Sequence, residues 1–291
     1  MTSDDLFHSL TPRNPSILKG MKTPTEMARD ALAQADALVI TAGAGMGVDS
    51  GLPDFRGREG FWRHYPPFAK LGLSFEMVAD PRWFTEDPRL AWGFYGHRLN
   101  LYRNATPHRG FQILLKAANR MQAGYYVVTS NVDGQFEKAG FDTSRIHEIH
   151  GSIHYLQCST PCHQNIWSAD QLHIEVSSED FRATSTLPVC PRCGVTSRPN
   201  ILMFSEWAWM SHNSDHQQSA FRTWLGSLHA RRLVVIECGA GTAIPSIRSI
   251  TCQVTRQFNG TLIRINPREY DVPPGQIALP CGALDGISQL I

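Results

Sequence analysis

Short apolar runs that alternate with helical patterns constrain the fold of this chain more than any other feature. The first run, residues 37–40, reads Ala-Leu-Val-Ile and opens directly into a glycine-rich segment. Similar runs occur at residues 125–129, 233–236 and 261–265, and helical patterns occupy residues 25–34, 89–103 and 110–121. Short buried strands separated by helices are typical of a parallel sheet that is covered on both faces. The sequence therefore predicts an α/β fold.

The composition of the chain excludes several classes of protein. Lysine and arginine number 27 and aspartate and glutamate 26, whereas a nucleic-acid-binding protein usually carries a strong basic excess. No apolar run approaches the roughly 20 residues of a membrane-spanning helix, and residues 1–16 lack the apolar core of a secretory signal. We therefore expect a cytoplasmic protein without a nucleic-acid or membrane partner. The oligomeric state is not constrained, and a monomer is compatible with the sequence.

Four cysteines fall into two close pairs, Cys158 with Cys162 and Cys190 with Cys193. Two thiol pairs at this separation have the spacing of a tetrahedral four-thiolate zinc site. In a reducing compartment metal ligation is favoured over disulfides, although exposed thiol pairs or a redox Cys-x-x-Cys are alternatives. His163 could substitute as a ligand, but four cysteines already complete the site. The other cysteines lie in apolar context and are expected in the core: Cys238, Cys252 and Cys281.

Residues 152–200 interrupt the alternation of strands and helices. They contain the four cysteines and several prolines and show no strong periodicity, so their own apolar core would be thin. A bound zinc ion would supply the missing folding free energy. We therefore expect a small zinc-binding module inserted into a sheet domain made of residues 25–151 and 201–291, after an extended segment at residues 1–24.

Gly43, Gly45 and Gly47 mark the end of the first predicted strand as a candidate ligand-binding turn. Glycines allow a ligand to approach the backbone closely, and free amides at a helix start bind phosphate. The spacing departs from Gly-x-Gly-x-x-Gly, and no acidic residue ends a second strand about 20 residues later. A plain dehydrogenase is therefore disfavoured, and tight-turn glycines without a ligand are an alternative.

A series of longer motifs follows this turn. Residues 49–57 read Asp-Ser-Gly-Leu-Pro-Asp-Phe-Arg-Gly, residues 129–134 read Thr-Ser-Asn-Val-Asp-Gly, and residues 148–152 read Glu-Ile-His-Gly-Ser. Further motifs lie at residues 198–206, 239–242 and 265–266. In order and spacing they resemble the signatures of the sirtuins, the NAD-dependent protein lysine deacylases. The resemblance implies a Rossmann-like NAD-binding domain, NAD as cofactor, and an acyl-lysine protein or peptide as partner.

The resemblance implies that residues of several motifs bind NAD. They are Gly43, Ala44, Gly45, Met46, Asp54, Phe55, Arg56, Ser130, Asn131, Asp133, Gly239, Gly241, Thr242, Asn266 and Cys281. The glycine turn would hold the pyrophosphate, and Asn131 and Asp133 would line the nicotinamide pocket. Phe55 and Arg56 would cover the nicotinamide ribose and exclude water that otherwise hydrolyses NAD. Ordinary core packing and a surface ion pair are the alternatives for these two residues.

His150 and Asn131 are the implied catalytic residues. A histidine pKa near 6.5 suits removal of a proton at neutral pH. By resemblance, the acyl oxygen attacks C1′ and expels nicotinamide, and His150 then deprotonates the ribose hydroxyls so that the acyl group moves to ADP-ribose. Residues 147–150 (His-Glu-Ile-His) are one residue short of the zincin pattern, and Gly151 disfavours a helix there. A catalytic metal is therefore not expected.

The chain departs from the sirtuin pattern at three positions. Ser130 stands where most of the family has Gln, Ser205 replaces a usual Gly, and Ala243 replaces a usual Ser. These departures leave the reaction itself open. Mono-ADP-ribosyl transfer or NAD hydrolysis in the same pocket is one alternative, and a non-catalytic NAD or ADP-ribose sensor is another.

The resemblance also implies a strand that pairs with a substrate peptide. Its substrate-binding residues are Leu202, Phe204, Ser205 and Glu206. Main-chain pairing would tolerate many peptide sequences and read mainly the modified lysine. A covered interior strand is the alternative. No role follows from the resemblance for the Trp207-Ala208-Trp209 segment.

Tyr95 and Arg98 lie three positions apart on the predicted helix 89–103 and therefore share a face. A phenol beside a guanidinium is a good carboxylate receptor. The spacing resembles the pair with which desuccinylating and demalonylating sirtuins hold an acidic acyl chain. The alternative is an amphipathic helix with Tyr95 half-buried and Arg98 solvated.

Overall fold

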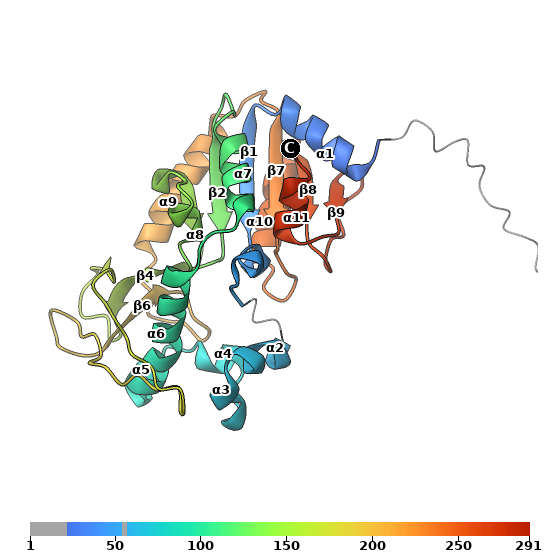
Figure 1. The fold of residues 1–291 in the computed structure, drawn as a ribbon. Coiled ribbons are helices and arrows are strands. Elements are labelled where there is room, and N and C mark those ends of the chain that lie inside the picture. The colour runs from blue at the N-terminus through green and yellow to red at the C-terminus, as the bar shows by residue number, and fades with distance from the viewer. Residues whose placement is uncertain (1–21, 54–56) are drawn as a thin grey trace, which may run out of the picture.

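Figure 1 shows the fold in a computed structural model, which describes residues 22–53 and 57–291. Within these residues, one sheet has six parallel strands in the order β3-β2-β1-β7-β8-β9, which is the Rossmann order. The strands are β1 (Ala37–Ala42), β2 (Tyr125–Thr129), β3 (Ile146–Glu148), β7 (Leu233–Cys238), β8 (Thr261–Ile265) and β9 (Ile277–Leu279). The predicted α/β fold with a Rossmann-like parallel sheet is confirmed.

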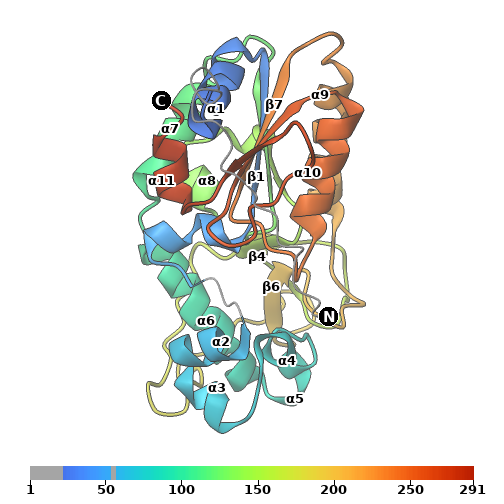
Figure 2. The same cartoon turned by 90° about the vertical axis from the view of Figure 1, so that its right-hand side faces the viewer.

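Helices cover both faces of this sheet (Figure 2). On one face lie α9 (His212–Gly226) and α10 (Ser246–Gln257), and on the other lie α1 (Pro24–Gln34), α7 (Arg109–Ala118) and α11 (Ala283–Ser288). Along β1, Leu38 and Ile40 pack toward α7, whereas Val39 packs toward α9. This alternation arises because successive side chains of a strand point to opposite faces of the sheet. Two separate apolar layers therefore hold the sheet between them.

A second region lies below the parallel sheet in Figure 1 and has its own core. It contains an antiparallel sheet of order β5-β4-β6 and five helices. Its elements are β4 (Gly151–Cys158), β5 (Trp167–Ser168), β6 (Ser197–Ile201), α2 (Gly57–His64), α3 (Pro66–Lys70), α4 (Phe75–Val78), α5 (Trp83–Glu86) and α6 (Pro88–Asn104). Aromatic rings dominate this core. The ring centroids of Tyr65, Phe68 and Phe94 lie 5.3 to 5.9 Å apart.

Helix α6 belongs to this second core. The helix predicted at residues 89–103 is confirmed. Its expected location, however, was against the parallel sheet. Its buried Trp92, Tyr95 and Leu99 instead share a cluster with Ile153 and Leu156 of β4. The core around the cysteine-containing segment therefore draws on residues 61–105 as well as on residues 152–200.

The carboxyl ends of the parallel strands face the second region (Figure 1). Ligands of open α/β sheets bind at this edge. Short helices lie in the turns after β1 and β2: η2 (Ala44–Met46), η3 (Val48–Ser50) and α8 (Gln135–Lys138). Another, η4 (Thr143–Arg145), precedes β3 at the opposite edge of the sheet. None of the helices in the described part of the chain has the length and apolar character needed to cross a lipid bilayer.

Candidate active site

Two glycine turns interlock at the carboxyl ends of β1 and β7. The Gly43 amide donates to the Cys238 carbonyl at 3.0 Å, and the Gly45 amide donates to the Gly239 carbonyl at 3.0 Å. A Cβ on Gly239, which has a φ of 62°, would lie 2.4 Å from the backbone of Gly45. Only glycine fits this contact. The Gly43 and Gly45 amides are engaged within the protein, so the prediction that the turn leaves its amides free is wrong for these two.

Asn131 ties the turn after β2 to the turn after β1. Its side-chain amide donates to the Gly43 carbonyl at 3.0 Å, and its backbone amide donates to Thr129 Oγ1 at 3.0 Å. The neighbouring Ser130 amide donates to the Ala42 carbonyl at 3.1 Å. Asn131 therefore fixes the position of the β2 turn relative to the glycine turn.

His150 lies in the turn that follows β3, beside these two turns. The Ile149 amide donates to the Thr129 carbonyl at 2.9 Å, and the His150 carbonyl accepts from the Leu202 amide at 2.9 Å. Burial lowers the pKa of the His150 imidazole, while a hydrogen bond with the Ser130 main chain acts in the opposite direction. The imidazole is therefore neutral at pH 7, the form that accepts a proton from a substrate.

Asp133 is buried behind the β2 turn. Its Oδ1 accepts from the Gln135 amide at 3.0 Å, and its carbonyl oxygen accepts from His154 Nε2 at 3.1 Å. Burial raises the pKa of its carboxyl group, although the Gln135 amide and the charges of His154 and Arg98 oppose this. Asp133 thus links the β2 turn to β4, and its carboxyl group interacts electrostatically with Arg98 on α6.

The expected substrate strand ends early. β6 stops at Ile201 and residues 202–206 form a turn, so the prediction that Phe204, Ser205 and Glu206 lie in a strand is wrong. The Phe204 amide donates to the Ala79 carbonyl at 2.9 Å. Ser205 has a φ of 53°, a left-handed conformation within the turn that follows the strand. The glycine that is usual at this position in the family that the sequence resembles would adopt this conformation without strain.

The Glu206 side chain points inward from this turn. Its carboxylate lies 2.8 Å from Arg198 Nη1, and both side chains are almost fully buried. Its Oε1 also accepts from the Ala208 amide at 2.7 Å. Glu206 therefore holds the turn in place, whereas Leu202 is 38% exposed and is available for contact. Arg198 was not among the expected site residues, because its partner Glu206 lies in the turn beyond the end of β6.

Tyr95 and Arg98 are both buried in the second core, so the alternative of a solvated Arg98 is wrong. Arg98 Nε donates to the Tyr102 hydroxyl at 2.9 Å. Its guanidinium lies 5.2 to 5.9 Å from the ring centroids of Phe75, Phe94, Tyr95 and Tyr102. Burial raises the pKa of the Tyr95 phenol, which therefore stays neutral. The Asp133 carboxyl group also interacts electrostatically with Arg98.

Asn266 and Thr242 lie on the other side of the glycine turns. Asn266 Nδ2 donates to the Ala240 carbonyl at 2.9 Å, and its Oδ1 accepts from the Glu269 amide at 3.0 Å. The Thr242 amide donates to a Glu269 carboxylate oxygen at 3.1 Å, and the Thr242 hydroxyl donates to the same oxygen. Glu269 is therefore part of this site. It was missed because it lies three positions beyond the Ile-Asn motif.

The remaining expected residues are placed less directly. Cys238 is buried at the end of β7, and Cys281 is half-buried within electrostatic reach of it. Burial raises the pKa of the Cys281 thiol. Asp54, Phe55 and Arg56 lie outside the described residues.

The four cysteines of the two pairs converge. The sulfur atoms of Cys158, Cys162, Cys190 and Cys193 all lie within 4.8 Å of one another. Two of the distances, Cys158 to Cys193 and Cys162 to Cys190, are 3.6 Å. A tetrahedral zinc ion with Zn–S bonds of about 2.3 Å needs sulfur atoms about 3.8 Å apart. The cluster fits a structural zinc, because four thiolates leave no open position for a substrate.

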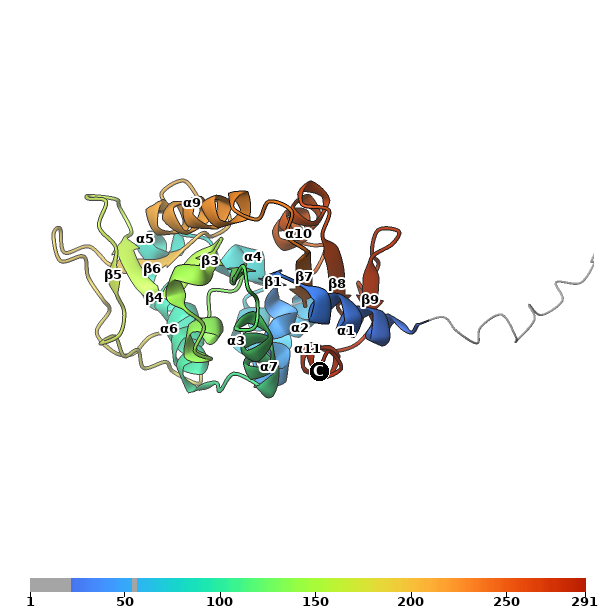
Figure 3. The same ribbon diagram turned by 90° about the horizontal axis from the view of Figure 1, so that it is seen from above.

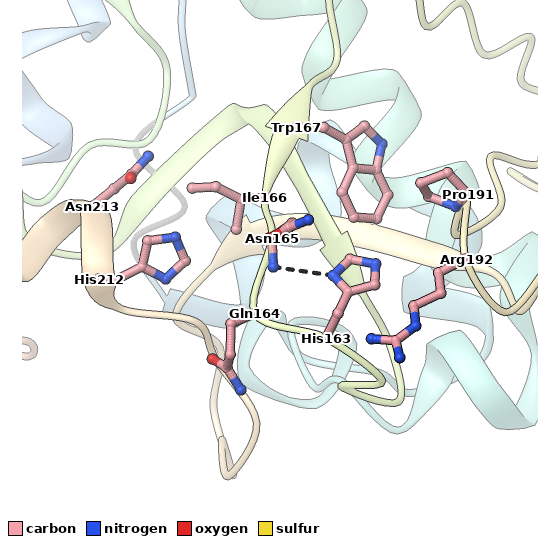
Figure 4. A pocket seen from close by; sticks show the side chains of 9 residues that line it. All are labelled: His163, Gln164, Asn165, Ile166, Trp167, Pro191, Arg192, His212 and Asn213. Atoms are coloured by element: carbon pink, nitrogen blue, oxygen red, sulfur yellow. Dashed lines mark hydrogen bonds between the residues drawn. The ribbon is translucent and has the colours of Figure 1, made fainter.

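A cavity of about 780 Å³ lies beside this cluster (Figure 4). It is lined by His163, Gln164, Asn165, Ile166, Trp167, Pro191, Arg192, His212 and Asn213. His163 Nδ1 accepts from the Asn165 amide at 3.0 Å, so its proton is on Nε2, which lies 3.3 Å from the Cys190 sulfur. His163 is therefore a hydrogen-bond donor to a thiolate ligand and not a substitute ligand.

The chain also matches a known family and its members. The model of the Sir2 family matches residues 43–222. This chain belongs to the Sir2 family. A Sir2 relative from Pyrococcus abyssi, named NAD-dependent protein deacylase, is 30% identical over 250 residues, which cover 86% of this chain and 88% of the relative. A relative of the same name from Thermococcus sibiricus is 29% identical over 245 residues, covering 84% and 85%.

A solved structure of a Sir2 homolog in complex with NAD superposes with a TM-score of 0.66. It is 26% identical and covers 91% of each chain. The Sir2 fold accounts for both cores, because the match spans the parallel sheet and the second region together. The carboxyl edge of the parallel sheet, which faces the second region, is therefore the part of this Sir2 protein in which NAD and substrate chemistry is expected.

Proposed function

We propose that this chain is an NAD-dependent protein-lysine deacylase that transfers the acyl group to ADP-ribose and releases nicotinamide. The observation that carries this proposal is the convergence of His150 with three turns. The β2 turn contacts it through Ser130, the β6 turn bonds to its carbonyl through Leu202, and the glycine turn is tied to the β2 turn by Asn131.

The interlocked glycine turns lie at the carboxyl ends of β1 and β7, the edge at which open α/β sheets bind dinucleotides. When bound, NAD supplies a ribose carbon that loses nicotinamide and the hydroxyls that receive the acyl group. We assign Gly43, Gly45 and Gly239 to its pyrophosphate, Asn131 and Asp133 to the nicotinamide, and Thr242 and Asn266 to the adenosine side. Glu269 now bonds to Thr242, so a nucleotide at Thr242 must share or replace that contact.

His150 is the general base in this proposal. Its imidazole is neutral because burial lowers its pKa, so it can take the proton of a ribose hydroxyl. The Ser130 main chain orients the ring, and the Leu202 amide holds its backbone. The base is therefore fixed from two sides before a substrate arrives.

The acyl-lysine substrate binds along the segment that follows β6. All residues of β6 itself are buried, whereas Leu202, directly after the strand, is 38% exposed. An extended peptide can pair with such a segment through main-chain hydrogen bonds. The expected cytoplasmic location and monomeric state stay predictions.

Tyr95 and Arg98 favour an acidic acyl chain such as succinyl or malonyl. The Arg98 guanidinium is buried, so a carboxylate beside it would be strongly bound. Tyr102 already accepts a hydrogen bond from Arg98 Nε and would orient the guanidinium. An acetyl group offers no charge to this cation.

Mass spectrometry of the products tests both proposals. The protein is incubated with NAD and matched acetyl-lysine and succinyl-lysine peptides, with a tube that lacks peptide. We expect deacylated peptide together with O-acyl-ADP-ribose, and faster turnover of the succinyl peptide. The variant Arg98→Met should remove the preference for succinyl, while the surface variant Arg256→Met should retain it. Faster turnover of the acetyl peptide in the unmodified protein would refute the acidic preference alone.

NAD hydrolysis or mono-ADP-ribosyl transfer is a second candidate, and Ser130 is the observation that favours it. A serine is shorter than the glutamine usual at this position, so water or another nucleophile can reach the ribose more easily. Free ADP-ribose in every tube, with both peptides unchanged, would support this candidate. The variant Ser130→Gln should then reduce the release of ADP-ribose.

A further inference from the structure

The Trp207-Ala208-Trp209 segment directly follows the segment assigned to the acyl-lysine, and the resemblance gives it no role. Its two tryptophans differ in exposure. Trp209 packs inward, because a Cβ on Gly151 of β4 would lie 3.2 Å from its indole nitrogen. Trp207, in contrast, is 95% exposed. Tryptophan is buried for most of its surface in folded proteins and is enriched where proteins bind a partner. The Trp207 indole is therefore a candidate contact for another molecule.

The backbone on both sides of Trp207 is held by buried side chains. The Ala208 amide donates to Glu206 Oε1 at 2.7 Å, and the Ala208 carbonyl accepts from Gln157 Nε2 at 2.9 Å. The Met210 amide donates to Oε1 of the same glutamine at 3.1 Å, and Gln157 itself is fully buried in β4. The exposed indole is thus presented from a fixed backbone. A contact with it costs less conformational entropy than a contact with a side chain on a flexible loop.

Two further exposed apolar side chains lie on the segments next to Trp207. The hydrogen bond from the Phe204 amide to the Ala79 carbonyl joins the turn after β6 to the end of α4, and Figure 3 shows α4 near the end of β6. Met77 of α4 is 42% exposed, and Leu202 is 38% exposed. Each lies two positions along the chain from one partner of this bond, and Trp207 lies three positions from Phe204. The surroundings of the substrate segment therefore favour an apolar side chain in the bound peptide.

We propose that Trp207 is a specificity-determining residue of the deacylase, whose indole packs against a large apolar side chain, such as phenylalanine, close to the acyl-lysine in the substrate. This inference rests on the proposed function, because it takes the acyl-lysine peptide as the molecule that contacts Trp207. The Leu202 amide bonds to the carbonyl of His150, so a peptide along residues 202–206 extends from the general base toward Trp207. An aromatic pair favours a phenylalanine there over a polar side chain.

Matched peptides test this selection by turnover. Each carries an acetyl-lysine or a succinyl-lysine and has either Phe or Ser at one of the two positions on each side of it. At one of these positions, kcat/KM for the Phe peptide should exceed that for the Ser peptide by about fivefold or more. The ratio should fall to near one in Trp207→Ser, while Met27→Ser, which removes an exposed apolar side chain on α1, should retain it. Deacylation without a preference for Phe, or with a preference that persists in Trp207→Ser, would overturn this inference alone.

Fluorine NMR of the full-length protein labelled with 5-fluorotryptophan detects the contact without turnover. The Trp207 resonance is the one that is missing in Trp207→Phe. The Phe peptide should shift this resonance, and the matched Ser peptide should shift it less. A shift without deacylation of any peptide would support the contact and contradict the reaction. No shift at saturating peptide would refute the role of Trp207. Self-association that is lost in Trp207→Ser, without a shift by peptide, would assign the indole to a contact with a second copy of the chain and would also refute the proposal.

Discussion

The two cores of the molecule each bury an arginine–glutamate pair, and the two pairs are satisfied differently. In the parallel sheet, Arg264 and Glu237 are register partners on β8 and β7. Arg264 donates through Nε and Nη2 to the two carboxylate oxygens and through Nη1 to the Asp271 carbonyl. In the second region, Arg198 pairs with Glu206 through Nη1, whereas its Nε and Nη2 have no hydrogen-bond partner among the described residues.

The difference follows from how each region is assembled. Strand register places Arg264 directly opposite its partner and brings further acceptors alongside. The second region joins segments far apart in the chain, and a strand residue there pairs with a turn residue. Unused donors make a buried pair costly. All three guanidinium nitrogens of Arg264 therefore have hydrogen-bond partners in the sheet domain. The stability of the second region depends more on aromatic packing and on zinc.

Metal removal should produce the largest effect and should be confined at first to the second region. A structural zinc in a zinc-finger peptide contributes about 10–16 kcal/mol to folding. We expect the double variant Cys190→Ser and Cys193→Ser to lose zinc and to lose hydrogen-exchange protection in β4, β6 and α6 before β1, β2 and β7. The control Cys252→Ser lies outside the cluster and should keep its zinc. Unchanged protection in zinc-free protein would show that the cluster is not structural.

Breaking each buried pair sharpens the same contrast. Glu206→Gln should lower the free energy of unfolding by about 3–5 kcal/mol, because it leaves Arg198 buried without a counter-charge. Glu237→Gln should cost less, since Arg264 keeps its bond to the Asp271 carbonyl. Urea denaturation measures both, and Asp36→Asn, which breaks the more exposed pair with Arg232, should lower the midpoint least. A larger loss for Glu237→Gln would contradict the contrast.

Glu148 lies at the junction of the two regions and should make stability depend on pH. Burial raises its pKa to about 8, with the nearby Glu137 carboxylate as a second cause. The unfolded chain loses this proton near pH 4.5, so the folded state is stabilised at low pH and loses this stabilisation as the pH rises to 8. Glu148→Gln should therefore be more stable than the unmodified protein at pH 8 by about 4 kcal/mol. Thermal melts at pH 5 and pH 8 measure the change. Equal dependence on pH in both proteins would show that Glu148 is ionised when folded.

The smallest expected effect is on the pH profile of turnover. Because burial lowers the pKa of His150, the acidic limb of kcat/KM should have its midpoint below the usual histidine value of about 6.5. Activity is lost as the pH falls through that midpoint, since the protonated ring cannot act as a base. A midpoint at or above 6.5 would mean that substrate binding reverses the effect of burial.

The parallel sheet could be predicted because local sequence determines it. Residues 37–40 and 125–129 are continuous apolar runs, and each forms a fully buried strand. The second region could not be predicted in the same way, because its contacts are long-range. Gly93 of α6 packs so closely against the Phe181 carbonyl that a Cβ would lie 1.8 Å from the oxygen. Helical periodicity shows that α6 has a buried face, but it does not show which segment covers that face.

The residues of the candidate site also differ in whether the sequence predicts them. The residues of compact motifs, such as Asn131 and His150, could be found by resemblance, and so could the four cysteines by their spacing. Glu269 could not be found, because its contact with Thr242 joins the ends of two different strands. The turn that follows β6 could not be predicted either, because the left-handed conformation of Ser205 has no clear sequence signal in a serine.

The release of nicotinamide with and without an acyl-lysine peptide tests the central claim most directly. We expect release that requires the peptide. In His150→Ala, formation of deacylated peptide should fall by about 10²–10⁴-fold, while the surface variant His216→Ala should retain full activity. Peptide-dependent deacylation at an undiminished rate in His150→Ala would contradict the assignment of the base. Equal release with and without peptide would contradict the deacylase itself.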